Sequence, residues 1–383
     1  MGAAGARRLL EPQVTLPFLE KLLQVLAQGG FTSTYKYAVL LGLIDLCVEA
    51  GQPPTSVTTT QLARRVVELY WPQVRPFDGK PLLNSAGKQA GIVSLIAAYI
   101  EDHGDIVSPG MAVLCDATGF ADLLREVEWI LIEYPLPRVQ RVGPHHDAFI
   151  YEVNWDTTVS RSRFLRGKQR RSDFDNAIRF VDGAALELVR LAPVLVPLLR
   201  AEWTAKVSAL NALAEARLAE HLFGRDRIDH SPLHRPLRSL QNGRCFYCNG
   251  SLSGGASQVD HFLPWSRYPD DGIDNLLLAH DRCNREKLYF LADIGFGHRW
   301  HARSLEQSGQ LDEIASEVRW ARDWTRTRGV VASVYQTVPD GVRLWAGEGN
   351  LRRVAIADLP AVHSFGRGLI ATEPRSQHRH NEG

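Results

Sequence analysis

Two pairs of metal-ligating side chains bracket a short segment in the second half of the chain, and they constrain its fold more than any other feature. Cys245 and Cys248 form a Cys-x-x-Cys pair, and His280 and Cys283 form a His-x-x-Cys pair. Each pair places two ligands on one tight turn, as a tetrahedral Zn²⁺ ion prefers. A redox Cys-x-x-Cys would be expected beside a β-α-β pattern, which is missing from the surrounding sequence. We therefore predict a structural zinc site. The alternative is a small apolar corner that has lost its metal.

Four protein ligands would close this zinc site. A closed site has no coordination position for water, so the ion would brace a segment that lacks a sufficient core of its own. The other two cysteines, Cys47 and Cys115, stand alone in apolar surroundings and are expected to be buried, inert thiols. Five cysteines in so long a chain do not predict a disulfide framework.

The segment between the two ligand pairs predicts two strands and a helix. Residues 258–263 are typical of a strand that ends at Pro264, and residues 275–279 form a second apolar run. A loop rich in Pro, Asp and Gly joins them across residues 265–274. Residues 280–290 favour a helix. The order strand, loop, strand, helix defines a ββα unit.

Three short motifs inside this unit occur in the order and at the approximate spacing of a known family. The segment resembles the HNH endonucleases, or ββα-metal nucleases with a zinc knuckle, of the stand-alone or defence-associated bacterial type. The resemblance covers about a fifth of the chain. Its motifs are Asp260-His261, Asp274-Asn275 and Cys283-Asn284-Arg285-Glu286-Lys287.

The resemblance implies a catalytic role for four of these residues. His261 matches the histidine that acts as general base, and an imidazole with a pKa of about 6.5 can accept a proton from water near neutral pH. Asp260 and Asn284 match the residues that hold a divalent ion, Mg²⁺ or Mn²⁺, through oxygen atoms. Asn275 corresponds to the central Asn, which fixes the loop and orients the base. The structural alternative is that His261 is a core histidine, that Asp260 caps a turn, and that Asn275 belongs to an ordinary turn.

Two positions depart from the common forms of the family. His280 stands where many members have Cys, which concerns the fourth zinc ligand. Asn284 stands where the family name implies His. Other members of the family also have Asn at this position. By resemblance, Arg285 and Lys287 are expected to contact phosphate, the alternative being that they are solvated helix residues.

A second cluster of positive charge lies upstream of the ββα unit. It comprises Arg161, Arg163, Arg166, Lys168, Arg170 and Arg171, with no acidic residue among them. Such a run could be an arm that binds the phosphate backbone without sequence preference, or a solvated helix surface. The net charge of +1 favours neither interpretation, because local clusters count for more than the total.

Length and composition indicate a protein of several domains. The 383 residues, 45% of them hydrophobic and 23% charged, are sufficient for two or three domains, each with its own core. We predict an N-terminal helical domain over residues 1–155, a helical, basic connecting region over 156–220, an HNH nuclease domain over 221–300, a C-terminal helical segment over 301–372 and a disordered tail over 373–383. The expected fold class is α+β, mainly α-helical.

The N-terminal region combines helical patterns with strand patterns. Residues 138–142 and 148–153 predict the two strands of a β-hairpin around a Gly-Pro-His-His-Asp turn. Helices followed by a hairpin could form a winged helix, a common DNA-binding shape, or a helical bundle with a hairpin attached. Residues 172–222 predict two long helices.

These observations together predict a metal-dependent DNA endonuclease. Double-stranded DNA is the expected substrate, cut as a nick by a monomer or on both strands by a homodimer. Analogy with bacterial HNH proteins that have helical extensions suggests restriction or anti-phage defence, with protein partners. The chain has no apolar stretch long enough to span a membrane and no signal peptide, so we expect a cytoplasmic protein. The alternatives are a catalytically silent, zinc-braced DNA-binding or scaffold protein, and an RNA-cleaving nuclease.

Overall fold

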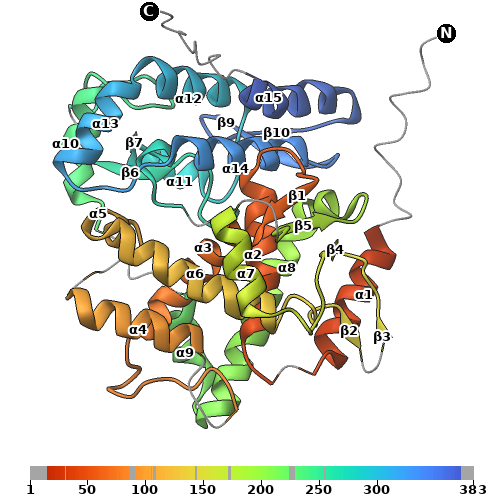
Figure 1. Ribbon diagram of the computed structural model, residues 1–383. Helices are drawn as coiled ribbons and strands as arrows, with labels where there is room; N and C mark the ends of the chain where they lie inside the picture. Colours follow the sequence, from red (N-terminus) through yellow and green to blue (C-terminus); the bar gives the residue numbers. More distant parts are fainter. Residues whose placement is uncertain are drawn as a thin grey trace, which may run out of the picture. The chain divides into compact units, whose positions relative to one another are not determined.

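The structure is a computed structural model in which the chain forms two compact units (Figure 1). It describes residues 15–30, 32–86, 91–104, 106, 109–142, 145–170, 174–223, 229–253, 256–268 and 270–371. One unit comprises residues 1–47 and 53–225, and the other comprises residues 48–52 and 226–383. The predicted tail, residues 373–383, lies outside the described residues, as does Arg171 of the basic run. The prediction of a mainly helical α+β protein is confirmed. None of the described helices combines the length and the apolar character needed to cross a bilayer.

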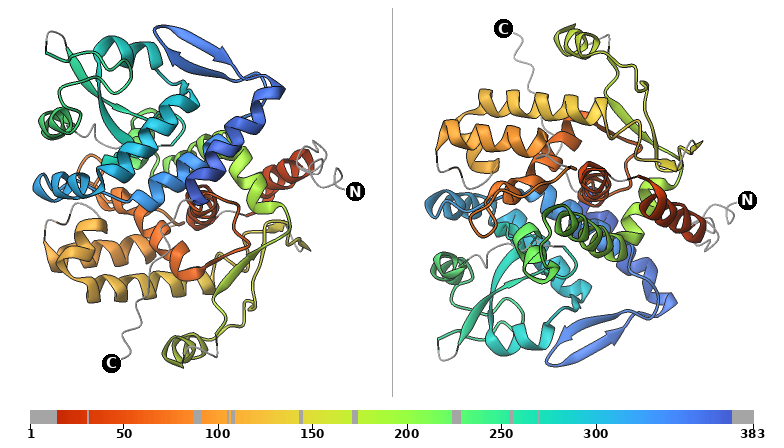
Figure 2. Two further views of the ribbon diagram at one scale, coloured as in Figure 1. Left: turned by 90° about the horizontal axis from the view of Figure 1, so that it is seen from above. Right: turned by 90° about the horizontal axis from the view of Figure 1, so that it is seen from below.

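Helices dominate the first unit. Thr58 begins α3 with a capping box in which Gln61 Oε1 accepts a hydrogen bond from the Thr58 backbone N–H, and Asp116 caps α6. In both views of Figure 2, α4 (orange) and α6 (yellow) run side by side. The helices are α1 (Thr15–Gln28), α2 (Tyr35–Glu49), α3 (Thr59–Tyr70), the 3₁₀ turn η2 (Trp71–Val74), α4 (Gly91–His103), α5 (Pro109–Cys115), α6 (Ala117–Glu133), α7 (Arg161–Arg170), α8 (Ala184–Asn211) and α9 (Glu215–Phe223).

The core of this unit is built around large aromatic side chains. Tyr70 of α3 and Trp203 of α8 are fully buried, and their ring centroids lie 5.0 Å apart in an edge-to-face arrangement. The Tyr70 hydroxyl shares a 2.6 Å hydrogen bond with the Thr34 hydroxyl, so its polar atom is satisfied inside the core. This packing positions α2, α3 and α8 as one scaffold.

The strands of the first unit pair differently from the prediction. β2 (Arg141–Val142) pairs with β3 (His145–His146), whereas β4 (Tyr151–Glu152) pairs with β5 (Ala177–Phe180). The predicted hairpin between residues 138–142 and 148–153 is therefore wrong, and the winged helix that depended on it is not confirmed. β5 also pairs with β1 (Ser56–Thr58), giving a three-stranded sheet in the order β1-β5-β4. The region predicted as two long helices thus begins with a strand before α8 and α9.

The second unit contains the two ligand pairs and the predicted ββα segment. β6 (Ser257–His261) and β7 (Leu276–His280) are antiparallel, with Ser257 opposite His280 and His261 opposite Leu276. Helix α11 follows directly after β7, so the ββα order is confirmed. The helical elements of this unit are α10 (Ser231–Leu240), the 3₁₀ turn η3 (Ile273–Asn275), α11 (Asp281–Lys287), α12 (Ile294–Glu306), α13 (Ser308–Glu317), α14 (Trp324–Gln336), the 3₁₀ turn η4 (Ile356–Asp358) and α15 (Leu359–Ala371).

The C-terminal part of this unit is not purely helical, which corrects the prediction for residues 301–372. β9 (Arg343–Gly347) and β10 (Asn350–Arg353) form a hairpin, and β8 (Leu291–Ala292) pairs parallel to β9. Figure 2 shows this hairpin, drawn in blue, as a two-stranded ribbon beside the helices of the second unit. The β8–β9 pairing joins the end of the ββα segment to strands more than fifty residues later in the chain.

Candidate active site and metal centre

The four predicted zinc ligands converge at one point. Cys245 and Cys248 lie on the turn after α10, His280 ends β7, and Cys283 lies in α11. Their ligand atoms all lie within 4.8 Å of one another, and Cys248 Sγ is 3.2 Å from His280 Nδ1. Because Zn–S and Zn–N bonds measure about 2.0 to 2.3 Å, a single ion could reach all four atoms.

Local hydrogen bonds orient His280 toward this cluster. Its Nε2 donates to the Ser251 carbonyl at 3.0 Å, so Nδ1 is the nitrogen with a lone pair facing the sulfur atoms. Gly250 makes room for the ring, since a Cβ at this position would lie 3.2 Å from His280 Cε1 and 3.4 Å from Cys248 Sγ. The Cys245 N–H closes the turn on the Gly250 carbonyl at 2.9 Å. The turn therefore presents the ligands in a fixed arrangement.

The electrostatics of the cluster also fit a cation. Burial raises the pKa of the Cys283 thiol, and the neighbouring Cys245 and Cys248 raise it further. Three thiols in one partly buried site cannot all ionise unless a positive ion compensates them. Zn²⁺ supplies that charge, so three sulfurs and one imidazole nitrogen fit the ion in geometry and in chemistry.

Asn275 ties the two ends of the loop between β6 and β7. Its Oδ1 accepts a 2.8 Å hydrogen bond from the Leu263 N–H, and its Nδ2 donates to the Asp270 carbonyl at 2.9 Å. The side chain is fully buried. Because a buried amide with partners on both its atoms has a single orientation, Asn275 fixes the path of the loop.

His261 lies at the end of β6 and is bound by a carboxylate from the loop. A second histidine, from outside the ββα segment, binds the same carboxylate. Its Nε2 is 2.8 Å from Asp271 Oδ1, and His230 Nε2 approaches the same oxygen at 3.1 Å. The Trp265 ring packs edge-on to the His261 ring at 5.4 Å between centroids. The His261 side chain is 18% exposed, so it is held by neighbours and still accessible.

The sequence analysis missed Asp271 and His230. Asp271 belongs to the Pro-Asp-Asp-Gly stretch for which the sequence predicts only a loop. A carboxylate in the loop after an Asp-His pair is a signal that could have drawn attention to it. His230, immediately before α10, carries no comparable signal, because only the tertiary fold brings it to the site.

Asp260 lies in a buried ion pair. Its Oδ2 is 3.1 Å from Lys287 Nζ and accepts a hydrogen bond from the Tyr247 hydroxyl. Lys287 is fully buried, and its Nζ also donates to the His261 carbonyl at 2.6 Å. The resemblance predicts a phosphate contact for Lys287; in this structure its ammonium is instead an internal partner of Asp260.

The contact between helix α11 and strand β6 positions both Asn284 and Asp260. Asn284 Nδ2 donates to Gln258 Oε1 at 3.1 Å, while Lys287, one turn later on α11, reaches Asp260. Gln258 and Asp260 share one face of β6, because side chains alternate along a strand. The Asp260 carboxylate and the Asn284 amide oxygen are hard donors of the kind that suits Mg²⁺ or Mn²⁺, although the Asp260 charge is already balanced by Lys287.

The remaining predicted phosphate contacts have varied surroundings. Arg285 is 71% exposed and forms a 2.8 Å ion pair with Asp281 on the same helix. The basic run forms α7, in which Arg161 pairs with Glu126 and Arg163 is exposed. The side chains of Arg166, Lys168 and Arg170 lie outside the described part of the chain.

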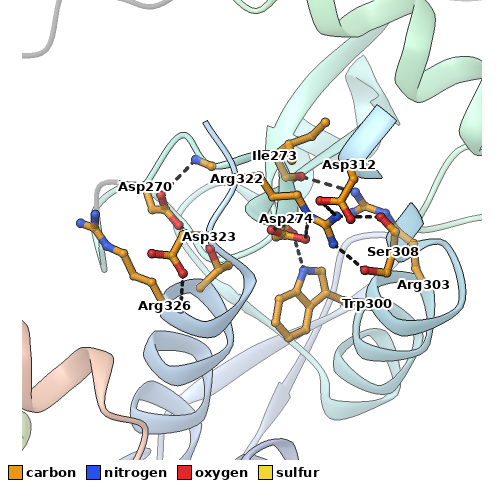
Figure 3. A network of polar contacts seen from close by, with 12 residues as sticks. Asp270, Ile273, Asp274, Trp300, Arg303, Ser308, Asp312, Arg322, Asp323 and Arg326 are labelled. Atoms are coloured by element: carbon orange, nitrogen blue, oxygen red, sulfur yellow. Dashed lines mark hydrogen bonds and ion pairs between the residues drawn. The ribbon is translucent and has the colours of Figure 1, made fainter. Parts of the chain in front are cut away.

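A buried polar network holds the turn that carries Asn275 (Figure 3). Asp274 is fully buried, 3.3 Å from Arg322 Nε, and its carbonyl accepts a 2.7 Å hydrogen bond from Trp300 Nε1. Burial raises the pKa of the Asp274 carboxyl, although Arg322 and Arg303 oppose the shift. Burial also lowers the pKa of Arg303 to about 10. Helices α12, α13 and α14, together with the segment that joins α13 to α14, therefore support the loop of the ββα unit.

Comparison with known proteins identifies the family of the ββα segment. Residues 245–290 match the family model of HNH endonucleases, which confirms the resemblance for this segment. Neither the curated proteins nor the solved structures gave a significant match to the chain. The matched residues include the four predicted zinc ligands, His261 and Asp271. His230 and the supporting network residues from Trp300 to Arg322 lie outside them.

Proposed function

We propose that this protein is a metal-dependent DNA endonuclease of the HNH type. The observation that carries the proposal is the HNH-matching segment itself, folded as ββα with an accessible His261 whose Nε2 is bound to a carboxylate. A histidine so held has Nδ1 as its basic atom. Such a site is suited to activating water for phosphodiester hydrolysis.

The proposed reaction uses the residues of the ββα unit. His261 Nδ1 accepts a proton from water as the water oxygen attacks phosphorus. The bond from phosphorus to the 3′ oxygen breaks, and that oxygen takes up a proton from solvent, leaving 5′-phosphate and 3′-hydroxyl ends. A divalent ion held by Asp260 and Asn284 would stabilise negative charge on the phosphate and the leaving oxygen. Arg285 would contribute positive charge beside the backbone.

A plasmid assay tests this function. Purified protein with supercoiled plasmid and Mg²⁺ or Mn²⁺ is expected to yield nicked circles with 5′-phosphate ends, and EDTA is expected to abolish the reaction. A single site cuts one strand, so linear product that forms from the start of the reaction, without prior accumulation of nicked circles, would indicate a homodimer. Labelled duplex DNA, single-stranded DNA and RNA run in parallel distinguish the substrates. Cleavage of RNA alone would replace the DNA assignment, and cleavage of none would support a silent scaffold.

Asn284→Ala should raise the Mg²⁺ concentration needed for half-maximal nicking by about tenfold or more, because it removes one of two proposed oxygen ligands. Arg282→Ala is the matched control, since Arg282 lies on the same helix, is 76% exposed and pairs with Glu286. The control should leave the Mg²⁺ requirement unchanged. An Mg²⁺ requirement unaltered in Asn284→Ala would contradict the ligand assignment.

Zinc removal provides a separate prediction. The purified protein is expected to contain one zinc per chain, and Cys248→Ser should lose it and melt at a lower temperature, because the brace contributes folding free energy. Cys115→Ser is the control, because Cys115 is outside the cluster and is exposed, which corrects the expectation of a buried thiol at this position. Atomic emission spectroscopy measures the zinc content, and circular dichroism measures the melting temperature. Full zinc occupancy in Cys248→Ser would refute the assigned ligand set.

The wider biological role rests on analogy. We propose a cytoplasmic defence or restriction nuclease, in which the helical first unit selects the substrate or docks a protein partner. The exposed Arg163 and the remainder of the basic run on α7 are proposed as a contact with the DNA backbone. Nicking that weakens steeply with salt would support this contact, and its loss in a variant with Arg161 and Arg163 replaced by Ala would locate it.

A further inference from the structure

Two histidines and one carboxylate form a cluster that extends beyond the HNH-matching segment. His261 Nε2 and His230 Nε2 approach the same Asp271 Oδ1, at 2.8 and 3.1 Å. The two rings meet at 86° with centroids 5.4 Å apart. The Asp271 side chain is 9% exposed, compared with 18% for His261 and 26% for His230. The carboxylate is thus the most buried member, with an imidazole on either side.

The hydrogen-bond chemistry fixes which nitrogen of His261 is basic. An ionised carboxylate only accepts hydrogen bonds, so both Nε2 atoms must carry the hydrogen. A neutral imidazole has a single N–H, and His261 therefore has its lone pair on Nδ1. Without the carboxylate, the two tautomers would interchange and a fraction of the protein would present the wrong nitrogen to water.

The surroundings hold Asp271 in place. Its carbonyl accepts a 2.7 Å hydrogen bond from Trp320 Nε1, and the Trp320 ring lies 5.8 Å from the His230 ring. His230 thus contacts both the Asp271 carboxylate and the tryptophan that holds the Asp271 backbone. Trp320 and His230 come from either side of the family segment in the sequence, so the cluster is a feature of this chain's own fold.

We propose that Asp271 and His230 are positioning residues for the general base, with Asp271 setting the tautomer and ring orientation of His261 and His230 locking the carboxylate. This inference rests on the proposed nuclease function. Asp271 acts on His261 directly, whereas His230 packs edge-on to the His261 ring and is proposed to act chiefly by holding Asp271. The ligand atoms of the three residues also lie within 4.8 Å of one another, so a metal site is the competing interpretation that the tests below must separate.

Nicking kinetics provide the first test. Asp271→Asn should lower kcat by about 10² to 10⁴-fold with little change in KM, by comparison with the loss seen when a histidine-orienting aspartate is replaced in a serine protease. His230→Ala should lower kcat by about tenfold, and His230→Gln, which retains an N–H donor, should restore most of it. Melting temperature and zinc content serve as controls for folding.

A double-variant cycle distinguishes the two roles. Because His230 is proposed to act chiefly by holding Asp271, adding His230→Ala to Asp271→Asn should cause little further loss of kcat. Multiplicative losses would overturn the proposal by giving His230 an independent role. A second zinc equivalent that depends on His230 would also overturn it, in favour of a metal site formed by the three residues.

The third test does not require activity. Nitrogen chemical shifts of the imidazoles, measured with ¹⁵N-histidine, should show His261 protonated at Nε2 alone in the wild type and as a tautomer mixture in Asp271→Asn; His261→Gln identifies the signals. A wild-type mixture would refute the positioning role even if the protein cleaves DNA. If the expected tautomer is found but no substrate is cut, the positioning is supported and the proposed function fails separately.

Discussion

The His261→Ala variant is expected to nick supercoiled DNA about 10² to 10⁴-fold more slowly than the wild type, which is the usual contribution of a general base. The side chain is 18% exposed and is bound at Nε2 by Asp271, so its removal deletes the basic atom without taking apart a core. The variant should retain the zinc ion, the melting temperature and the affinity for DNA. Initial rates of plasmid nicking at saturating Mg²⁺ measure the effect.

Chemical rescue strengthens this test. If His261 acts as a base, added imidazole should enter the space left by the side chain and restore part of the rate, increasingly as the pH passes the pKa of free imidazole. His363→Ala is a suitable control, because His363 lies on α15 and bonds only to the Val338 carbonyl among the described residues. Equal rates in wild type and His261→Ala would refute the proposed catalytic role.

The local parts of the site were predictable, because they depend on short spacings. A Cys-x-x-Cys turn and a His-x-x-Cys turn each place two ligands together whatever the rest of the chain does. The apolar runs on either side of a loop rich in Pro, Asp and Gly likewise predict two strands. The structure accordingly gathers Cys245, Cys248, His280 and Cys283, and pairs β6 with β7.

Contacts between distant segments could not be predicted in the same way. β4 has strand character, but its partner β5 lies beyond α7, and nearest-neighbour reasoning paired residues 148–153 with the wrong segment. His230 reaches Asp271 only because α10 packs near β6. Both errors arise because sequence patterns report local periodicity and carry little information on long-range pairing.

Two other features of the structure have a local signal in the sequence. The sequence Gly347-Glu348-Gly349 adopts positive φ at all three positions, which is typical of a tight turn between the strands of the β9–β10 hairpin. Lys287 lies three residues after Asn284 and therefore shares its helix face. If Asn284 faces β6, Lys287 must face β6 too. A buried position for the Lys287 side chain is therefore expected.

Lys287→Met is expected to lower the free energy of unfolding by about 3 to 5 kcal/mol, since breaking a buried ion pair leaves an uncompensated charge. Lys287 is fully buried, and Asp260 would retain only the Tyr247 hydroxyl among the described contacts of its carboxylate. Arg285→Met on the same helix is the matched control, because its ion pair with Asp281 is solvated and should contribute little. Urea denaturation of the zinc-loaded protein measures both variants.

The double variant Asp260→Asn/Lys287→Met separates stability from chemistry. Neutralising both partners removes the uncompensated charge, and the Tyr247 hydroxyl can still donate to the amide oxygen, so most of the lost stability should return. Nicking should not return, because the proposed carboxylate ligand is gone. Stability unchanged in Lys287→Met would mean that the pair is hydrated in solution. Activity regained in the double variant would show that Asp260 serves the fold alone, and the divalent ion would then need ligands other than the Asp260 carboxylate.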